Sequence, residues 1–103
     1  MSELLTESNI TELKEKLNDK LEKEVVAFLN YREGGDIYIG VDDTGHPVPI
    51  ENPDDCQCKI ADRIKNNIQP ATLGLFDIVK EKYLGRDIIH IIISGGTEKP
   101  YYL

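Results

Sequence analysis

The sequence lacks tryptophan, has only two cysteines and contains no apolar run near the roughly 20 residues that a membrane-spanning helix requires. Cys56 and Cys58 are separated by one residue, a spacing unsuited to a structural disulfide, so we expect free thiols in a reducing cytoplasm. The N-terminus shows no basic segment followed by an apolar one, so no secretory signal is visible. These absences predict a cytoplasmic protein that does not enter a membrane.

Positive charge is also scarce. Twelve lysines and arginines stand against 19 acids, which gives a formal net charge of −7. This balance argues against a broad phosphate-binding surface, because nonspecific nucleic-acid binding depends on basic side chains. It leaves open a small basic patch, and also acids that reach a phosphate through a bound metal ion. The 103 residues, 40% of them hydrophobic, predict one domain spanning 1–103 with a modest core. The apolar end at 101–103 suggests that this domain is the N-terminal fragment of a longer protein.

The spacing of apolar residues predicts an α+β fold with a mostly antiparallel sheet of about four to five strands and two main helices. The predicted helices span 19–31 and 54–67, and the predicted strands span 10–15, 36–41, 75–84 and 88–94. Segment 46–50 contains two prolines, so it is either an edge strand or a loop. One long N-terminal helix is the alternative to a strand at 10–15. Asn18 and Asp19 favour the split, because Asp19 and Glu22 are typical of a capping box.

Residues 27–45 organise the rest of the chain. Gly34 and Gly35 supply a sharp reversal from helix to strand, and Gly40 within the strand indicates a close backbone approach or a bulge. The strand ends on Asp42 and Asp43. An Asp-rich turn is the ordinary explanation of this pattern.

Candidate chemistry is limited to the acids. No phosphate-binding glycine loop is present, and His90 lies in an apolar strand, where we expect a hydrogen-bonded sheet residue. Convergent carboxylates can hold Mg²⁺ or Mn²⁺, which would activate water for phosphoryl transfer. With 19 acids in the chain, spacing alone does not single out such a site.

Three segments together are similar to the Schlafen-type AlbA domain, and the resemblance covers nearly the whole chain. The segments read Glu7-Ser8-x-x-x-Glu12-Leu13-Lys14, then Ala27-Phe28-x-Asn30, then Gly34-Gly35-x-Ile37-x-Ile39-Gly40-Val41-Asp42-Asp43-x-Gly45. Residues 67–70 also resemble the helix-ending element of that family. The resemblance implies an α+β domain in which 12–14 form a strand. Members are commonly described as DNA-binding modules at the N-terminus of bacterial regulators, many with a divergent ATP-binding region.

The resemblance also implies candidate catalytic residues. In animal Schlafen proteins the domain is an RNA endonuclease with a Glu-x-x-x-x-Glu pair and an Asp of the strand-ending run. Carried over, these positions are Glu7, Glu12 and Asp43, which would be the ligands of Mg²⁺ or Mn²⁺. The chain departs from the family pattern at Leu13, where phenylalanine is usual, and near Pro49, where a glycine is usual.

Two function classes follow, with a third beside them. The first is a nucleic-acid-binding module of a bacterial transcriptional regulator that contacts DNA or RNA. Its candidate phosphate contacts are Lys14, Arg32, Lys59, Arg63 and Lys65. Lys59 and Arg63 share a helix face, although a solvated face is an equally ordinary explanation. The second is a metal-dependent RNA endonuclease. The third is an assembly module that forms a homo-oligomer.

Overall fold

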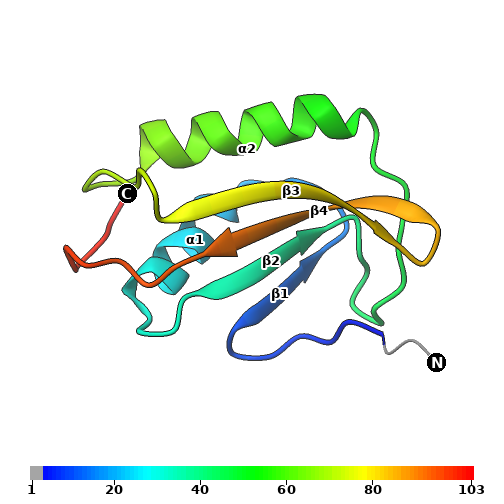
Figure 1. Ribbon diagram of the computed structural model, residues 1–103, viewed down its shortest axis with the longest axis horizontal. Coiled ribbons are helices and arrows are strands. Elements are labelled where there is room, and N and C mark those ends of the chain that lie inside the picture. Colours follow the sequence, from blue (N-terminus) through cyan, green and yellow to red (C-terminus); the bar gives the residue numbers. More distant parts are fainter. Residues whose placement is uncertain (1–3) are drawn as a thin grey trace.

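The elements observed match those predicted from the apolar pattern. The computed structural model describes residues 4–103 (Figure 1). Its elements are β1 (Thr11–Lys14), α1 (Leu21–Asn30), β2 (Gly35–Ile39), α2 (Pro53–Asn67), β3 (Phe76–Tyr83) and β4 (Arg86–Ile93). The α+β class and the split between an N-terminal strand and a helix are confirmed. Segment 46–50 is a loop that makes a single bridge, from Pro47 to Val41.

The sheet has four strands in the order β1-β2-β4-β3. β1 and β2 are parallel, and the other two pairs are antiparallel, so the prediction of a mostly antiparallel sheet is confirmed. β3 and β4 form a tight hairpin in which Leu84 and Gly85, both with positive φ, connect the paired residues Tyr83 and Arg86. Because β1 and β2 run in the same direction, their carboxyl ends meet at one edge of the molecule.

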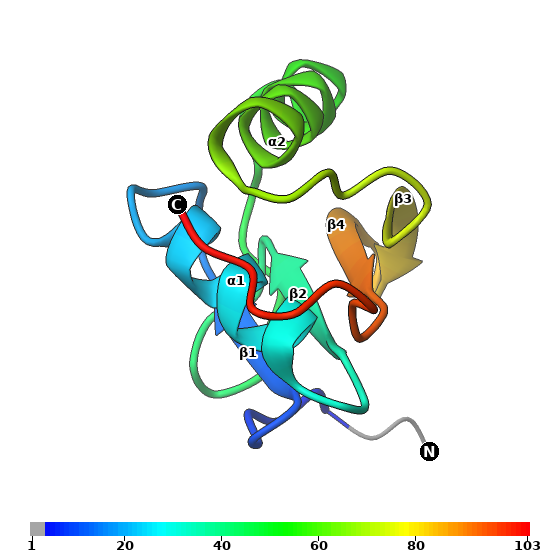
Figure 2. The same cartoon turned by 90° about the vertical axis from the view of Figure 1, so that its left-hand side faces the viewer.

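Both helices cover the same face of the sheet (Figure 2). Alternate residues of β2 and β4 point into this layer, as the period of a strand requires. The core joins Leu21, Val25, Phe28 and Leu29 of α1, Ile60 and Ile64 of α2, and Ile37, Ile39, Ile89, Ile91 and Ile93 of the sheet. Residues 4–103 contain no helix that combines the length and apolar character needed to cross a membrane.

The motif residues of the α1–β2 connection are explained by packing. A Cβ at Gly35 would overlap the ring of Phe28, and Gly34 has a φ of +69° and lies against the carbonyl of Ile93. Asn30 exchanges two hydrogen bonds with the backbone of Tyr101, donating to its carbonyl at 3.0 Å and accepting from its N–H at 2.7 Å. These residues therefore fix the path of the chain and do no visible chemistry.

The other face of the sheet carries a bridged histidine. His90 belongs to β4, which lies between β2 and β3. Its Nε2 lies 2.7 Å from Asp36 Oδ1 and its Nδ1 lies 3.0 Å from Glu81 Oε2. Its ring stacks on Tyr38 at a centroid distance of 4.2 Å. The expectation of a hydrogen-bonded sheet residue is confirmed. The two carboxylates contact opposite ring nitrogens, so they do not converge on one point.

The start of α1 differs from the predicted capping box. The helix begins at Leu21, and its N-cap residue Lys20 makes no side-chain cap. Asn18 Oδ1 accepts the N–H of Lys20 at 2.9 Å instead. Glu22 does not reach back to Asp19, because its carboxylate is held by α2.

Candidate functional site

The carboxyl ends of β1 and β2 form the candidate site. The N–H groups of Gly40 and Val41 both donate to the carbonyl of Lys14, at 2.8 and 3.1 Å, and Gly40 has a φ of +97°. The chain therefore leaves β2 by bending across the end of β1, which is the irregularity that Gly40 predicts. Ligands commonly bind outside the carboxyl ends of parallel strands, because the loops that leave those ends surround a crevice.

Asp42 and Asp43 have different roles in the loop that follows. Asp42 Oδ1 accepts the N–H of Thr44 at 3.0 Å, its hydroxyl at 2.7 Å and the N–H of His46 at 3.0 Å. The Thr44 hydroxyl, followed by the His46 N–H, lowers the pKa of Asp42. Asp42 thus builds the turn, as expected for an Asp-rich loop. Asp43 has an exposed side chain that lines a hollow beside the strand ends.

Tyr83 fastens the N-terminal segment to this loop. Its hydroxyl donates to the carbonyl of Gly45 at 2.6 Å and accepts the N–H of Leu5 at 2.9 Å. Gly45 has a φ of +89°, and a Cβ there would overlap the carbonyl of Leu5. The segment that carries Glu7 is therefore held beside the loop that carries Asp43.

Glu7 and Glu12 form a carboxyl pair at the free edge of β1. Glu7 Oε2 accepts the N–H of Leu13 at 3.3 Å. A hydrogen bond between the two carboxyls lowers the pKa of Glu7 and raises the pKa of Glu12 to about 7, and burial and the charge of Glu24 add to the second effect. The pair therefore holds a proton more readily than two separate glutamates would.

The third predicted ligand stands apart from this pair. Asp43 lines a hollow of about 450 Å³ together with Leu13, Lys14, Lys16 and Asn18. Within residues 4–103, no three His, Cys, Asp or Glu side chains are grouped so as to hold a metal ion. The structure thus joins Glu7 to Glu12 and places Asp43 in the neighbouring hollow.

Two of the predicted cations line this edge, and both have acidic partners. Lys14 keeps only 6% of its side chain exposed, and its Nζ lies 2.9 and 3.1 Å from the two carboxylate oxygens of Glu24. The positive charge of Lys14 is therefore largely balanced by Glu24 inside the domain. Lys59 pairs with Asp55 at 3.0 Å across one turn of α2, and both side chains are exposed.

The other three predicted cations do not line this hollow. Arg63 braces α2 against α1: its guanidinium holds both carboxylate oxygens of Glu22 and the carbonyl of Asn18. This contact lowers the pKa of Glu22 to about 2. Burial of the carboxylate opposes the effect, and a hydrogen bond from an N–H of Asn67 adds to it. Arg32, in the α1–β2 turn, and Lys65, in the last turn of α2, are exposed.

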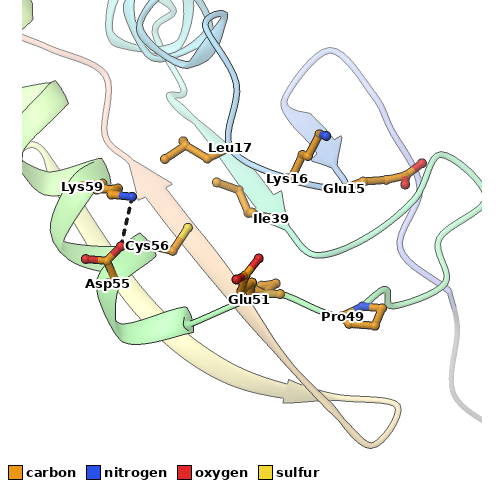
Figure 3. A pocket seen from close by; sticks show the side chains of 10 residues that line it. Glu15, Lys16, Leu17, Ile39, Pro49, Glu51, Asp55, Cys56 and Lys59 are labelled. Atoms are coloured by element: carbon orange, nitrogen blue, oxygen red, sulfur yellow. Dashed lines mark ion pairs between the residues drawn. The ribbon is translucent and has the colours of Figure 1, made fainter.

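Lys16 is the residue that the sequence reasoning missed. It lines the 450 Å³ hollow and also a second one of about 340 Å³, between the β1–α1 loop, residues 49–51 and the start of α2 (Figure 3). It is exposed and forms no ion pair with any residue of the described range 4–103. Its position two residues after the end of β1 was the available signal.

Comparison with known proteins places the chain in a family. Its fold is similar to the N-terminal domain of a RecG-related protein from Nitrosomonas europaea, with a TM-score of 0.72 and 24% identity over 95% of this chain and 72% of that one. It is also similar to the DIP2311 protein from Corynebacterium diphtheriae, with a TM-score of 0.67 and 21% identity over 90% of this chain. The chain spans only 19% of the DIP2311 protein. No curated protein sequence matches it. The model of the Schlafen, AlbA_2 family matches residues 7–103, and the chain belongs to this family.

Proposed function

We propose that this chain is a nucleic-acid-binding module, the DNA-binding part of a cytoplasmic bacterial transcriptional regulator. The observation that carries the proposal is the position of Lys16, an exposed cation without an acidic partner in 4–103, where two hollows meet at the carboxyl ends of β1 and β2. Family membership supports it. So does the similar Nitrosomonas europaea protein, which is described as related to the ATP-dependent DNA helicase RecG.

The acidic balance of the chain limits the size of the contact. Lys16 and Lys59 are the cations that line the hollows with exposed side chains, so we expect about two phosphate contacts. Each phosphate contact contributes about −0.9 to the log–log salt slope with duplex DNA and about −0.7 with single strands. The expected slope is therefore about −1.8 with duplex DNA and about −1.4 with single strands, and the affinity is modest.

Fluorescence anisotropy with labelled duplex DNA, single-stranded DNA and RNA at several salt concentrations tests the proposal. Lys16→Ala should weaken binding and reduce the slope by about one contact. Lys65→Ala is the matched control, because Lys65 is also exposed and without an ion pair in 4–103 but lines neither hollow. A slope near zero with all three ligands rejects the module. A larger effect of Lys65→Ala moves the contact surface to the C-terminal end of α2.

A second candidate is a divalent-metal-dependent RNA endonuclease, and the Glu7–Glu12 pair favours it. Two carboxyls that share a proton offer a place where a cation can replace that proton. Glu7 and Glu12 would hold Mg²⁺ or Mn²⁺, which supplies Lewis-acid activation of water when bound. Asp43 is not grouped with them, so the residues do not form the three-carboxylate site, and we derive no cleavage step.

Calorimetric titration with Mn²⁺ and a cleavage assay with labelled RNA test this candidate. The wild-type protein should bind one Mn²⁺ and Glu7→Gln should abolish the heat of binding. Cleavage that persists in a variant with alanine at positions 7, 12 and 43 would assign the activity to a contaminant and reject the candidate.

A further inference from the structure

We infer that the hollow in Figure 3 holds one unstacked nucleobase of a single strand, and that it prefers cytosine and adenine. The inference rests on the proposed function and adds to it a ligand class and a position. The hollow has a volume of about 340 Å³, near the lower end of the range for small-ligand sites. That volume suits one base and its sugar.

The floor of the hollow is apolar. Leu17, Ile39, Ile50 and Cys56 line it. Burial raises the pKa of the Cys56 thiol, which favours its protonated form, and this side chain packs as a small apolar group. A flat heterocycle can cover such a floor with its π-face, as bases do when they leave a stack to be read one at a time.

Two cations stand on the rim at different sides of the floor. Figure 3 shows Lys59 on the α2 side and Lys16 on the β1 side, with Leu17 and Ile39 between them. A base within a strand has a phosphate on each side, so cations on two sides of the hollow suit a strand that passes across it. The ion pair of Lys59 with Asp55 joins two exposed side chains, and such pairs contribute little, so Lys59 can exchange Asp55 for a phosphate.

Three carboxylates on the rim set the preference between bases. Glu15, Glu51 and Asp55 line the hollow, and an ionised carboxylate accepts hydrogen bonds. The amino groups of cytosine and adenine donate to such acceptors. At the same position guanine, thymine and uracil present a carbonyl acceptor, which cannot donate to a carboxylate. The rim therefore favours cytosine and adenine.

The two cysteines supply a test on the wild-type protein. Cys56 lines the hollow, whereas Cys58, two residues further along α2, is exposed and does not. Methyl methanethiosulfonate modification, followed by mass spectrometry of each cysteine, is measured with and without saturating oligo(dC). We expect modification of Cys56 to slow at least about fivefold, and modification of Cys58 to stay unchanged. Equal rates for Cys56 with and without bound oligonucleotide overturn the inference.

A pair of tryptophan variants gives an independent test. Leu17→Trp fills the hollow, and Leu73→Trp places the same side chain at a leucine that is 87% exposed and lines neither hollow. With both folds checked by thermal melting, Leu17→Trp should weaken binding of oligo(dC) about tenfold, and Leu73→Trp should not. If Leu17→Trp fails to fold, protection of Cys56 decides.

The base preference is read by anisotropy with oligo(dC), oligo(dA) and oligo(dT), and with oligo(rC) and oligo(rU) to separate DNA from RNA. Oligo(dC) or oligo(dA) should bind at least about fivefold more tightly than oligo(dT). Equal or tighter binding of oligo(dT), or full affinity in Leu17→Trp, overturns the inference and leaves the proposed function standing. Absence of binding to every oligonucleotide and to duplex DNA rejects both.

Discussion

Arg63 is expected to stabilise the domain and not to bind nucleic acid, and Arg63→Ala tests this. The substitution leaves the Glu22 carboxylate, whose side chain is 11% exposed, with Asn67 as its remaining side-chain donor in 4–103. Removing one partner of a buried pair costs about 3–5 kcal/mol, and an exposed pair contributes about 0–1 kcal/mol. Arg63 keeps 26% of its side chain exposed, so the cost should lie between these limits, at about 2–3 kcal/mol.

The pH dependence gives this prediction a second signature. The pKa of Glu22 is about 2 in the folded state, below the ordinary value of 4.5 that applies to the unfolded chain. The ionised carboxylate therefore contributes stability that is fully present above the unfolded-state pKa and is lost as the pH falls towards the folded-state pKa. Arg63→Ala removes the main cause of this lowering. The difference in free energy of unfolding between wild type and variant should therefore shrink by roughly half between about pH 7 and about pH 3.

Urea unfolding followed by circular dichroism at several pH values measures both effects. Lys59→Ala is the control, because Lys59 lies on the same helix and also has an acidic partner, but both side chains are exposed. Its cost should stay below about 0.5 kcal/mol at every pH. A loss in Arg63→Ala as small as that of the control, or a loss independent of pH, would refute the bracing role. Lost nucleic-acid binding with unchanged stability would assign Arg63 to the interface instead.

Three further substitutions test the packing around the site. Gly34→Ala should cost more than about 2 kcal/mol by thermal or urea unfolding, because the φ of Gly34 is positive and a Cβ there would overlap the Ile93 carbonyl. Gly74→Ala is the control and should cost only about 1 kcal/mol, because Gly74 has a positive φ but open space around it. Tyr83→Phe should cost about 1–2 kcal/mol and speed hydrogen exchange at the Leu5 amide, since that amide loses its acceptor. Asn30→Ala should cost about 1–3 kcal/mol, because it removes both hydrogen bonds to Tyr101; a loss below 0.5 kcal/mol would mean that water replaces them.

The elements of this fold could be predicted because their signals are local. The continuous apolar run of β4 indicates a central strand, and Pro53 followed by two aspartates indicates the start of α2. The strand at Thr11–Lys14 is a weaker case, because apolar residues there also fit a helix. Its parallel pairing with β2 decides between strand and helix. This pairing uses backbone groups, which carry no sequence information.

Contacts between distant elements escaped the sequence. Arg63 finds Glu22 across 41 positions, and this pairing depends on how α1 and α2 lie on the sheet. Lys14 appears exposed by composition, yet its place in β1 under α1 turns it towards Glu24. Two of the five cations expected at phosphates, Lys14 and Arg63, are therefore held in largely buried ion pairs, whereas the pair of Lys59 with Asp55 is exposed. The family resemblance singled out Glu7 and Glu12. These two residues are only five positions apart, and the bridge between Ser8 and Thr11 brings them together locally.

The residues of the site divide into those that hold the backbone and those that face a ligand. A Cβ at Gly40 would overlap the Ile50 side chain and one at Gly45 would overlap the carbonyl of Leu5, so their replacement alters the fold before it alters any contact. Lys16 and Glu51 stand on the rim of the hollow with exposed side chains, and little packing depends on them. Exchanging rim residues should therefore change which strand is bound while the domain stays folded. A module of this kind can keep one backbone and acquire new targets through the charges around the hollow.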